Sequence, residues 1–116
     1  MKTLQLIILS FTFIISGCAS EPVIPPATDA AITEGAKQYM SCAANWIRQI
    51  DDGKSDALTI AKGSATVCTK EFNHYTHVIT QGANEPVRRR VEIDTNNSKV
   101  ELILLPLVLK LRSQNK

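Results

Sequence analysis

The cysteines are the residues of this 116-residue chain whose chemistry depends most on their surroundings. There are three of them, Cys18, Cys42 and Cys68, and an odd number leaves one thiol over if the other two pair. They form no Cys-x-x-Cys motif, so a redox-active pair is not indicated. Each cysteine therefore serves as a modification site, as half of a structural bridge or as a plain buried thiol.

Cys18 directly follows a segment of the export type. Residues 1–17 carry a lysine at position 2, continue in an apolar run and end in small residues, which is typical of a signal peptide. The run is shorter than the about 20 apolar residues that span a bilayer. The tetrad ISGC, residues 15–18, resembles the lipobox of bacterial lipoproteins. An ordinary secretory signal or a short membrane anchor is the alternative interpretation.

The lipobox resemblance implies that Cys18 becomes the lipidated first residue of the mature chain. A diacylglyceryl thioether forms on its sulfur, the signal is cut before it, and the new amine receives a further fatty acid such as palmitate. Three acyl chains hold a protein on a membrane almost irreversibly, because each buried methylene contributes about 0.8 kcal/mol. Ala19 follows in place of the aspartate that retains lipoproteins at the inner membrane. We therefore expect the periplasmic face of the outer membrane.

Two helices are predicted on either side of a short turn. Apolar residues recur at helical spacing over residues 29–52 and again over 56–81. Gly53 ends the first helix and Ser55 is expected to cap the second. Helices of this length joined by so short a link must lie antiparallel.

The register of this hairpin predicts a disulfide. In a hairpin centred near residue 54, Cys42 faces roughly residue 66, within half a turn of Cys68. The same register sets Trp46 against small residues of the second helix, as close packing requires. Exported proteins meet an oxidising compartment. We therefore expect a Cys42–Cys68 bridge; two buried free thiols are the alternative.

A third, C-terminal helix is predicted to cover the hairpin, which completes an all-α fold. Ser98 and Glu101 have the spacing of a capping box, and the following residues are mostly leucine. Pro106 is expected to bend or break this helix, and a strand over 99–105 is the alternative. The link before it is expected to hold a short helix from Asn84 and a loop at residues 94–97.

The chain thus divides into a signal peptide (1–17), a proline-rich tether (18–28) and a small helical domain (29–116). Proline cannot join a helix or an inner strand, so the tether is expected to be extended and to hold the domain roughly 30 Å from the membrane. An arm that packs on the domain is the alternative. Without Lys2, 12 of the 13 basic residues remain against 11 acidic ones, which gives no indication of nucleic-acid binding.

Few residues have the spacing of a catalytic or metal site. Glu71 and His74 form one Glu-x-x-His unit, whereas carboxylate-bridged metal bundles use two such units and two further carboxylates. We expect a surface pair at the rim beneath the third helix, with His77 in solvent. No nucleophile elbow or glycine-rich phosphate loop occurs. We predict no enzyme, no cofactor and no metal.

The run Arg88-Arg89-Arg90 is the strongest local charge. It is interpreted either as a solvated face or as a contact for an acidic partner, lipid phosphate or an anionic envelope polymer.

The preferred function is that of an envelope lipoprotein that binds a partner protein as an interaction or assembly factor. In outline, a tethered helical domain with a disulfide resembles the pilotins of secretion systems, although the likeness is one of architecture. An exclusion or immunity lipoprotein of a phage or plasmid, which masks a receptor, is the alternative. A periplasmic hydrolase or metal-binding enzyme is a third and weaker hypothesis.

Overall fold

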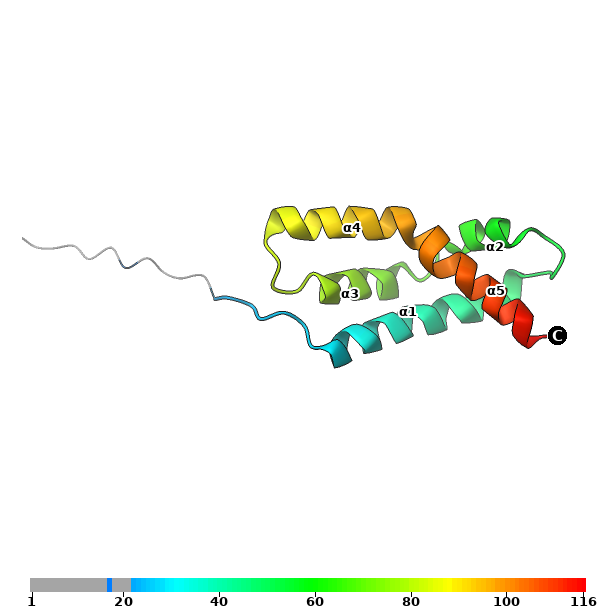
Figure 1. Ribbon diagram of the computed structural model, residues 1–116, viewed down its shortest axis with the longest axis horizontal. Coiled ribbons are helices and arrows are strands. Elements are labelled where there is room, and N and C mark those ends of the chain that lie inside the picture. Colours follow the sequence, from blue (N-terminus) through cyan, green and yellow to red (C-terminus); the bar gives the residue numbers. More distant parts are fainter. Residues whose placement is uncertain (1–16, 18–21) are drawn as a thin grey trace, which may run out of the picture.

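The computed structural model describes residues 17 and 22–116 (Figure 1). The described part is helical, and its elements are α1 (Asp29–Ile50), α2 (Ala57–Ser64), α3 (Thr69–Ile79), α4 (Glu85–Lys99), the π-helical turn η1 (Val100–Leu104) and α5 (Leu105–Gln114). No strand occurs in these residues, which confirms the predicted all-α class. The alternative of a strand over 99–105 is wrong.

Helix α1 begins where predicted because Thr28 caps it. The Thr28 hydroxyl accepts a hydrogen bond from the backbone N–H of Ala31 at 3.2 Å, which satisfies one of the amides that the first turn leaves unpaired. The helix buries Tyr39, Ala43 and Ile47, which are spaced by four residues. Trp46, predicted to pack against small residues of the second helix, is 38% exposed and is not part of the core cluster. Helix α1 packs on α5 as well as on α2 and α3, and Ile47 is fully buried.

The second half of the hairpin is broken in two. The apolar spacing predicts one helix over 56–81, but α2 ends at Ser64 and α3 starts at Thr69. Cys68, between them, has a left-handed backbone with φ 57° and ψ 32°, which a right-handed helix cannot contain. Helix α3 packs along α1, whereas α2 packs on α1 and on the C-terminal rod. The break therefore lets the two halves follow different neighbours.

Helices α4 and α5 are joined through η1 without a loop and form one C-terminal rod (Figure 1). The predicted helix start near Asn84 is confirmed, since the Asn84 side chain accepts a hydrogen bond from the N–H of Val87 at 3.1 Å. The predicted loop at residues 94–97 is wrong. The capping box is wrong too, because Ser98 lies inside the rod and its hydroxyl donates to the Asp94 carbonyl at 2.7 Å. Polar residues are tolerated here because α4 has no buried residue.

Pro106 does not break the rod with a loop, but the rod bends between α4 and α5, as predicted (Figure 1). The proline stands at the start of α5, directly after the π-helical turn, in which the N–H of Leu105 bonds to the carbonyl of Val100, five residues back. A π-helical turn contains one more residue than an α-helical turn. Such turns are common where the regular hydrogen bonding of a helix is interrupted. Pro106 has no backbone N–H to donate, and the missing hydrogen bond falls at the junction between the π-helical turn and α5.

The core lies between α1, α2, the start of α3 and the second half of the rod. Its buried members are Tyr39, Ala43, Ala44, Ile47, Ile60, Ala61, Phe72, Leu104, Leu107, Val108 and Leu111. The rings of Tyr39 and Phe72 pack at 5.0 Å between centroids. The Tyr39 hydroxyl is buried with no hydrogen-bond partner among the described residues, and this burial raises the pKa of Tyr39 to about 12.

The turn between α1 and α2 is tied to the end of the rod by Arg112. Its guanidinium donates to the Asp51 carboxylate at 2.7 and 2.9 Å and to the Ser55 carbonyl at 2.7 Å. The hydrogen bond from Arg112, followed by that from the backbone of Gly53, lowers the pKa of Asp51. The cap of α2 is Asp56 and not Ser55 as predicted.

The next residue, Asp52, makes this turn sensitive to acid. Its carboxylate accepts hydrogen bonds from the backbone N–H groups of Ser55 (2.7 Å) and Lys54 (2.9 Å), and these lower the pKa of Asp52 to about 2. Because the folded-state pKa lies below the ordinary aspartate value of about 3.9, this stabilisation is fully present above pH 4 and is lost as the pH falls toward 2. We expect Asp52→Asn to lower Tm near neutral pH, and we expect its difference from wild type to shrink between pH 4 and 2 in circular dichroism melts.

Asp94→Asn is the control for this experiment, because Asp94 is exposed on α4 and its carboxylate accepts no hydrogen bond from the described residues. Its Tm difference from wild type should stay small throughout. A constant difference for Asp52→Asn down to pH 2 would show that the charge of Asp52 does not hold the turn.

Candidate interaction surfaces

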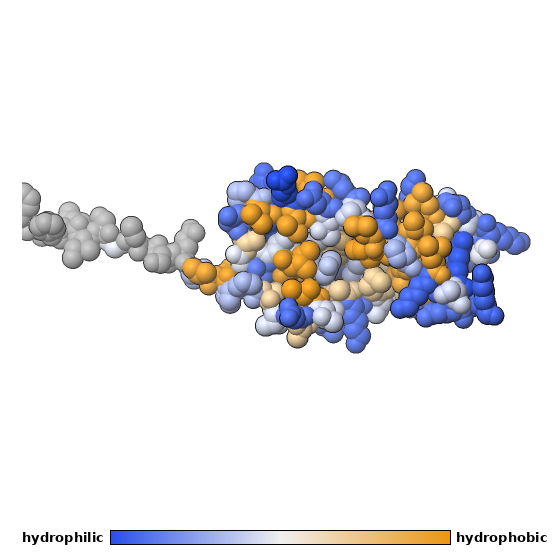
Figure 2. All heavy atoms as spheres, viewed as in Figure 1, coloured by the Kyte–Doolittle hydropathy of each residue, from blue (hydrophilic) through white to orange (hydrophobic). Residues whose placement is uncertain are grey.

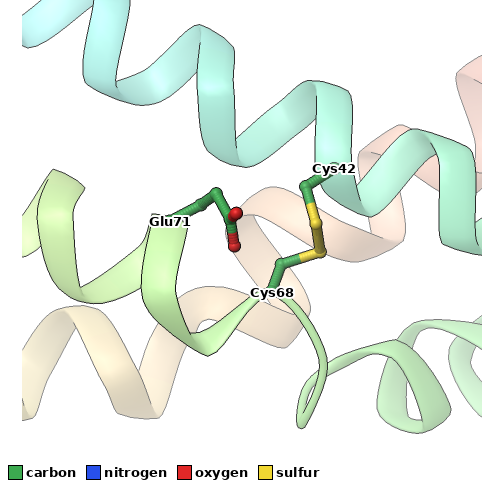
Figure 3. Close-up of side chains that lie close together, drawn as sticks. All are labelled: Cys42, Cys68 and Glu71. Carbon is green, nitrogen blue, oxygen red and sulfur yellow. A yellow bond between two sulfur atoms is a disulfide. The ribbon is translucent and has the colours of Figure 1, made fainter.

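Cys42 of α1 and Cys68 are joined by a disulfide, as predicted, with their Cα atoms 6.0 Å apart (Figure 3). Both residues are half-buried. The bridge connects the middle of α1 with the residue that directly precedes α3. The disulfide therefore fixes the break between α2 and α3 against helix α1.

The carboxylate of Glu71 lies beside this disulfide (Figure 3). One ligand atom from each of Cys42, Cys68 and Glu71 lies within 4.8 Å of the others, a spacing suited to a metal ion if both sulfurs were thiolates. In a disulfide neither sulfur is a thiolate, which is the form of cysteine that binds metals. With the disulfide formed, the cluster offers a metal ion one ligand group, the Glu71 carboxylate.

His74 is exposed, as predicted, but it does not lie at the predicted rim beneath the C-terminal helix. A Cβ built on Gly35 of α1 would meet the His74 ring at 4.0 Å and the Tyr75 backbone at 3.6 Å, so this side of α3 faces α1. Glu71 likewise lines a shallow hollow with Lys37 and other α1 residues. Within the described residues, His74 belongs to no group of three metal-ligating side chains. The Glu-x-x-His unit of α3 thus faces α1.

Another side of α3 faces α4 across an open hollow of about 450 Å³, which we call the α3–α4 groove. It is lined by Phe72, Asn73, Thr76 and His77 of α3 and by Glu92, Ile93 and Asn96 of α4. Phe72 is buried, whereas Ile93 is 52% exposed. The ammonium of Lys99 lies 4.7 Å from the centre of the Phe72 ring, and burial there lowers the pKa of Lys99. His77, expected in solvent, is exposed but lines the groove.

Helix α4 is unusual because none of its 15 residues is buried. Helices in proteins are stabilised mostly by packing of one apolar face, yet α4 is attached mainly through η1. Figure 2 shows hydrophobic side chains at the surface over α4 and between α3 and α4. The sequence does not predict this groove, because residues 94–97 have the composition of a loop. The spacing of Val87 and Val91 after the Asn84 cap is the signal for a longer helix.

The arginine run lies in the first two turns of α4. Arg88 and Arg89 form ion pairs with Glu85, at 3.4 Å for Arg89. In the part of the chain that the structure describes, Arg90 forms no ion pair. The side chain of Arg89 is 71% exposed. The run is thus a solvent-accessible cationic surface at the start of the helix.

The chain before α1 packs on the turn that precedes α4. The side-chain amide of Gln81 donates to the Pro25 carbonyl at 3.0 Å. Gly82 has φ +81°, and a Cβ there would lie 2.8 Å from the Ile24 carbonyl oxygen, so both backbone shape and space require glycine. A tether that is free of the domain can therefore include only the residues before Ile24.

Residues 1–16 and Cys18 lie outside the described residues, so the signal peptide and the lipid attachment site stay predictions. Within the described part, no helix is long and apolar enough to cross a bilayer. Comparisons of the chain with protein-family models, with curated proteins and with solved structures find no match, so its function has to be inferred from its own residues.

Proposed function

We propose that this chain is a small lipoprotein of the bacterial cell envelope that binds a segment of a partner protein in the α3–α4 groove and so serves as an interaction or assembly factor. The observation that carries the proposal is α4, a helix of 15 residues that buries none of them and yet faces a partly apolar wall of α3. A segment bound there would remove apolar surface from water, which is the main driving force of association.

The side chains of the groove indicate the chemistry of the bound segment. Ile93 offers exposed apolar surface from α4, and Phe72 of α3 lines the groove although it is buried, whereas the amides of Asn73 and Asn96 both donate and accept hydrogen bonds. A hollow of about 450 Å³ accommodates a few side chains and not a folded domain. We therefore expect a short segment with one or two large apolar side chains and polar flanks.

The proposal places the protein on the periplasmic face of the outer membrane, held by acyl chains on Cys18. The lipobox resemblance and Ala19 support this location, and a structural disulfide is in keeping with an oxidising compartment. The mass of the mature N-terminus tests the anchor by itself. We expect a chain that begins at a triacylated Cys18, and an unmodified N-terminus would contradict the anchor.

Site-specific crosslinking in living cells tests the groove. A photo-reactive residue at Asn96, which lines the groove, should crosslink to one envelope protein, and the adduct should disappear when Ile93→Asp places a charge on the apolar wall. Immunoblots of envelope fractions measure the adduct.

Leu109→Asp is the matched control, because Leu109 is 54% exposed and does not line the groove, whereas Ile93 is 52% exposed. This variant should keep the adduct. Equal loss in both variants, or an adduct that survives Ile93→Asp, would contradict binding in the groove.

A further inference from the structure

One end of the domain combines exposed apolar side chains with guanidinium groups. The chain before α1, the turn at 80–83 and the first turns of α4 enclose a hollow of about 670 Å³ that Ile24 and Arg88 both line. Beside it, Val23 is 91%, Ile24 61% and Val87 50% exposed. We refer to the following residues as the tether-side end: Val23, Ile24, Val87, Arg88, Arg89 and Arg90.

The arginines reach toward this end. Helical side chains tilt toward the N-terminus of their helix, and Arg90 stands only about 8 Å along the axis from Glu85, the first residue of α4. Consecutive helical residues point about 100° apart, so the three arginines spread over about 200° around the helix and do not share one face. Among the described residues, Glu85 is the acidic residue of the first turn of α4, and the three arginines outnumber it; Glu21 lies three residues before Ile24 in the sequence.

We propose that the tether-side end docks on a surface of anionic phospholipid headgroups. Arg89 and Arg90 contact lipid phosphates, and Val23, Ile24 and Val87 enter the headgroup layer. The inference rests on the proposed lipid anchor at Cys18 and goes beyond it, because an anchored domain need not touch the bilayer.

The contact between the tether and the domain brings this end close to the anchor. Ile24 is held against Gly82, so six residue steps separate it from Cys18, and these span about 20 Å at most. A tether that is free up to residue 28 would allow roughly 30 Å. Each basic residue near an anionic surface strengthens binding by about fivefold. Because the anchor already supplies a high local concentration, this modest attraction is enough to orient the domain.

A flat lipid surface fits the tether-side end better than an acidic protein segment does. The three arginines spread over about 200° at the end of a helix, whereas a bound peptide needs its contacts along one groove. Basic residues interleaved with exposed apolar ones are the composition of segments that lie in the headgroup region. An acidic protein partner is therefore kept as a separate outcome of the test.

Fluorescence quenching by lipid tests the docking. The mature protein with Trp46→Phe and Val87→Trp has one tryptophan, at the tether-side end. It is reconstituted through its own anchor into vesicles whose acyl chains carry bromine near the headgroups. We expect quenching about threefold stronger in vesicles rich in phosphatidylglycerol than in purely zwitterionic ones. Molar salt should remove the difference, because it screens charges beyond about 3 Å.

The control is Trp46→Phe with Leu109→Trp, which places the tryptophan on α5, where quenching should be weak and independent of lipid charge. Arg89→Glu with Arg90→Glu should abolish the difference at residue 87, and the salt dependence serves as the test if that variant does not fold. Equal quenching at residues 87 and 109, or no effect of lipid charge, would overturn the proposal. Loss of an envelope-protein crosslink in the arginine variant, without quenching in any vesicle, would overturn it in favour of an acidic protein.

The anchor and the docking can fail separately. If mass analysis finds no lipid on Cys18, the same tryptophan protein is added to preformed vesicles. Quenching that depends on phosphatidylglycerol then still supports docking, and its absence overturns it.

Discussion

Removal of the disulfide should lower the free energy of unfolding by about 3–4 kcal/mol, because a bridge across a separation of 26 residues restricts the unfolded chain by that amount on the loop-entropy estimate. Domains of this size are stable by only about 5–15 kcal/mol in total. Cys42→Ser with Cys68→Ser should therefore unfold at a much lower urea concentration than wild type in oxidising buffer. An unchanged midpoint would contradict a structural role for the bridge.

The backbone of Cys68 provides a matched control for this experiment. Its left-handed φ of 57° costs an L-residue about 1–2 kcal/mol, a cost that glycine does not have. Among bridge-free proteins, Cys42→Ser with Cys68→Gly should then be more stable than Cys42→Ser with Cys68→Ser by about 1 kcal/mol. Equal stability would show that the left-handed turn relaxes once the bridge is gone.

The hairpin and its bridge can be predicted from sequence because local signals agree there. The apolar period of residues 29–52 and the glycine turn fix the first helix and the direction of the second, and the register then brings Cys42 to Cys68. The break at residues 65–68 cannot be predicted in this way, since the apolar period runs straight through it. Helix α2 packs on η1 and α5, whereas α3 packs along α1 and contacts α4, so the break reflects the tertiary arrangement.

The groove and the tether contact are harder to predict, for a related reason. Residues 94–97 prefer turns by composition, but they continue a helix that is capped at Asn84 and joined to the apolar rod, so the chain remains helical with no buried residue in α4. The hollow beside α3 exists only because that helix extends past it. The sequence indicates that Gly82 ends a helix. It does not indicate that the Ile24 carbonyl oxygen lies 2.8 Å from the position that a Cβ of residue 82 would occupy.

The rod itself should depend on one side chain of the π-helical turn. Leu104 is fully buried in η1 and belongs to the core, so Leu104→Ala leaves a cavity and should cost about 2–5 kcal/mol in urea unfolding. Leu102 stands in the same turn, two residues earlier, and is 71% exposed, so Leu102→Ala should cost less than about 0.5 kcal/mol. The change in helix propensity is the same in both, and the difference therefore isolates burial.

Hydrogen exchange of the Leu104→Ala protein tests whether packing at Leu104 also holds the α4 side of the α3–α4 groove in place. Because α4 is attached mainly through η1 and buries no residue of its own, a cavity at Leu104 should speed exchange in α4 more than in α1. The wall of the groove that carries Ile93 would then be held in place by the core beneath the π-helical turn. Equal losses of stability for the two leucine variants would show that the rod does not pack at η1. Unchanged exchange in α4 would show that this helix is held by contacts other than those with η1.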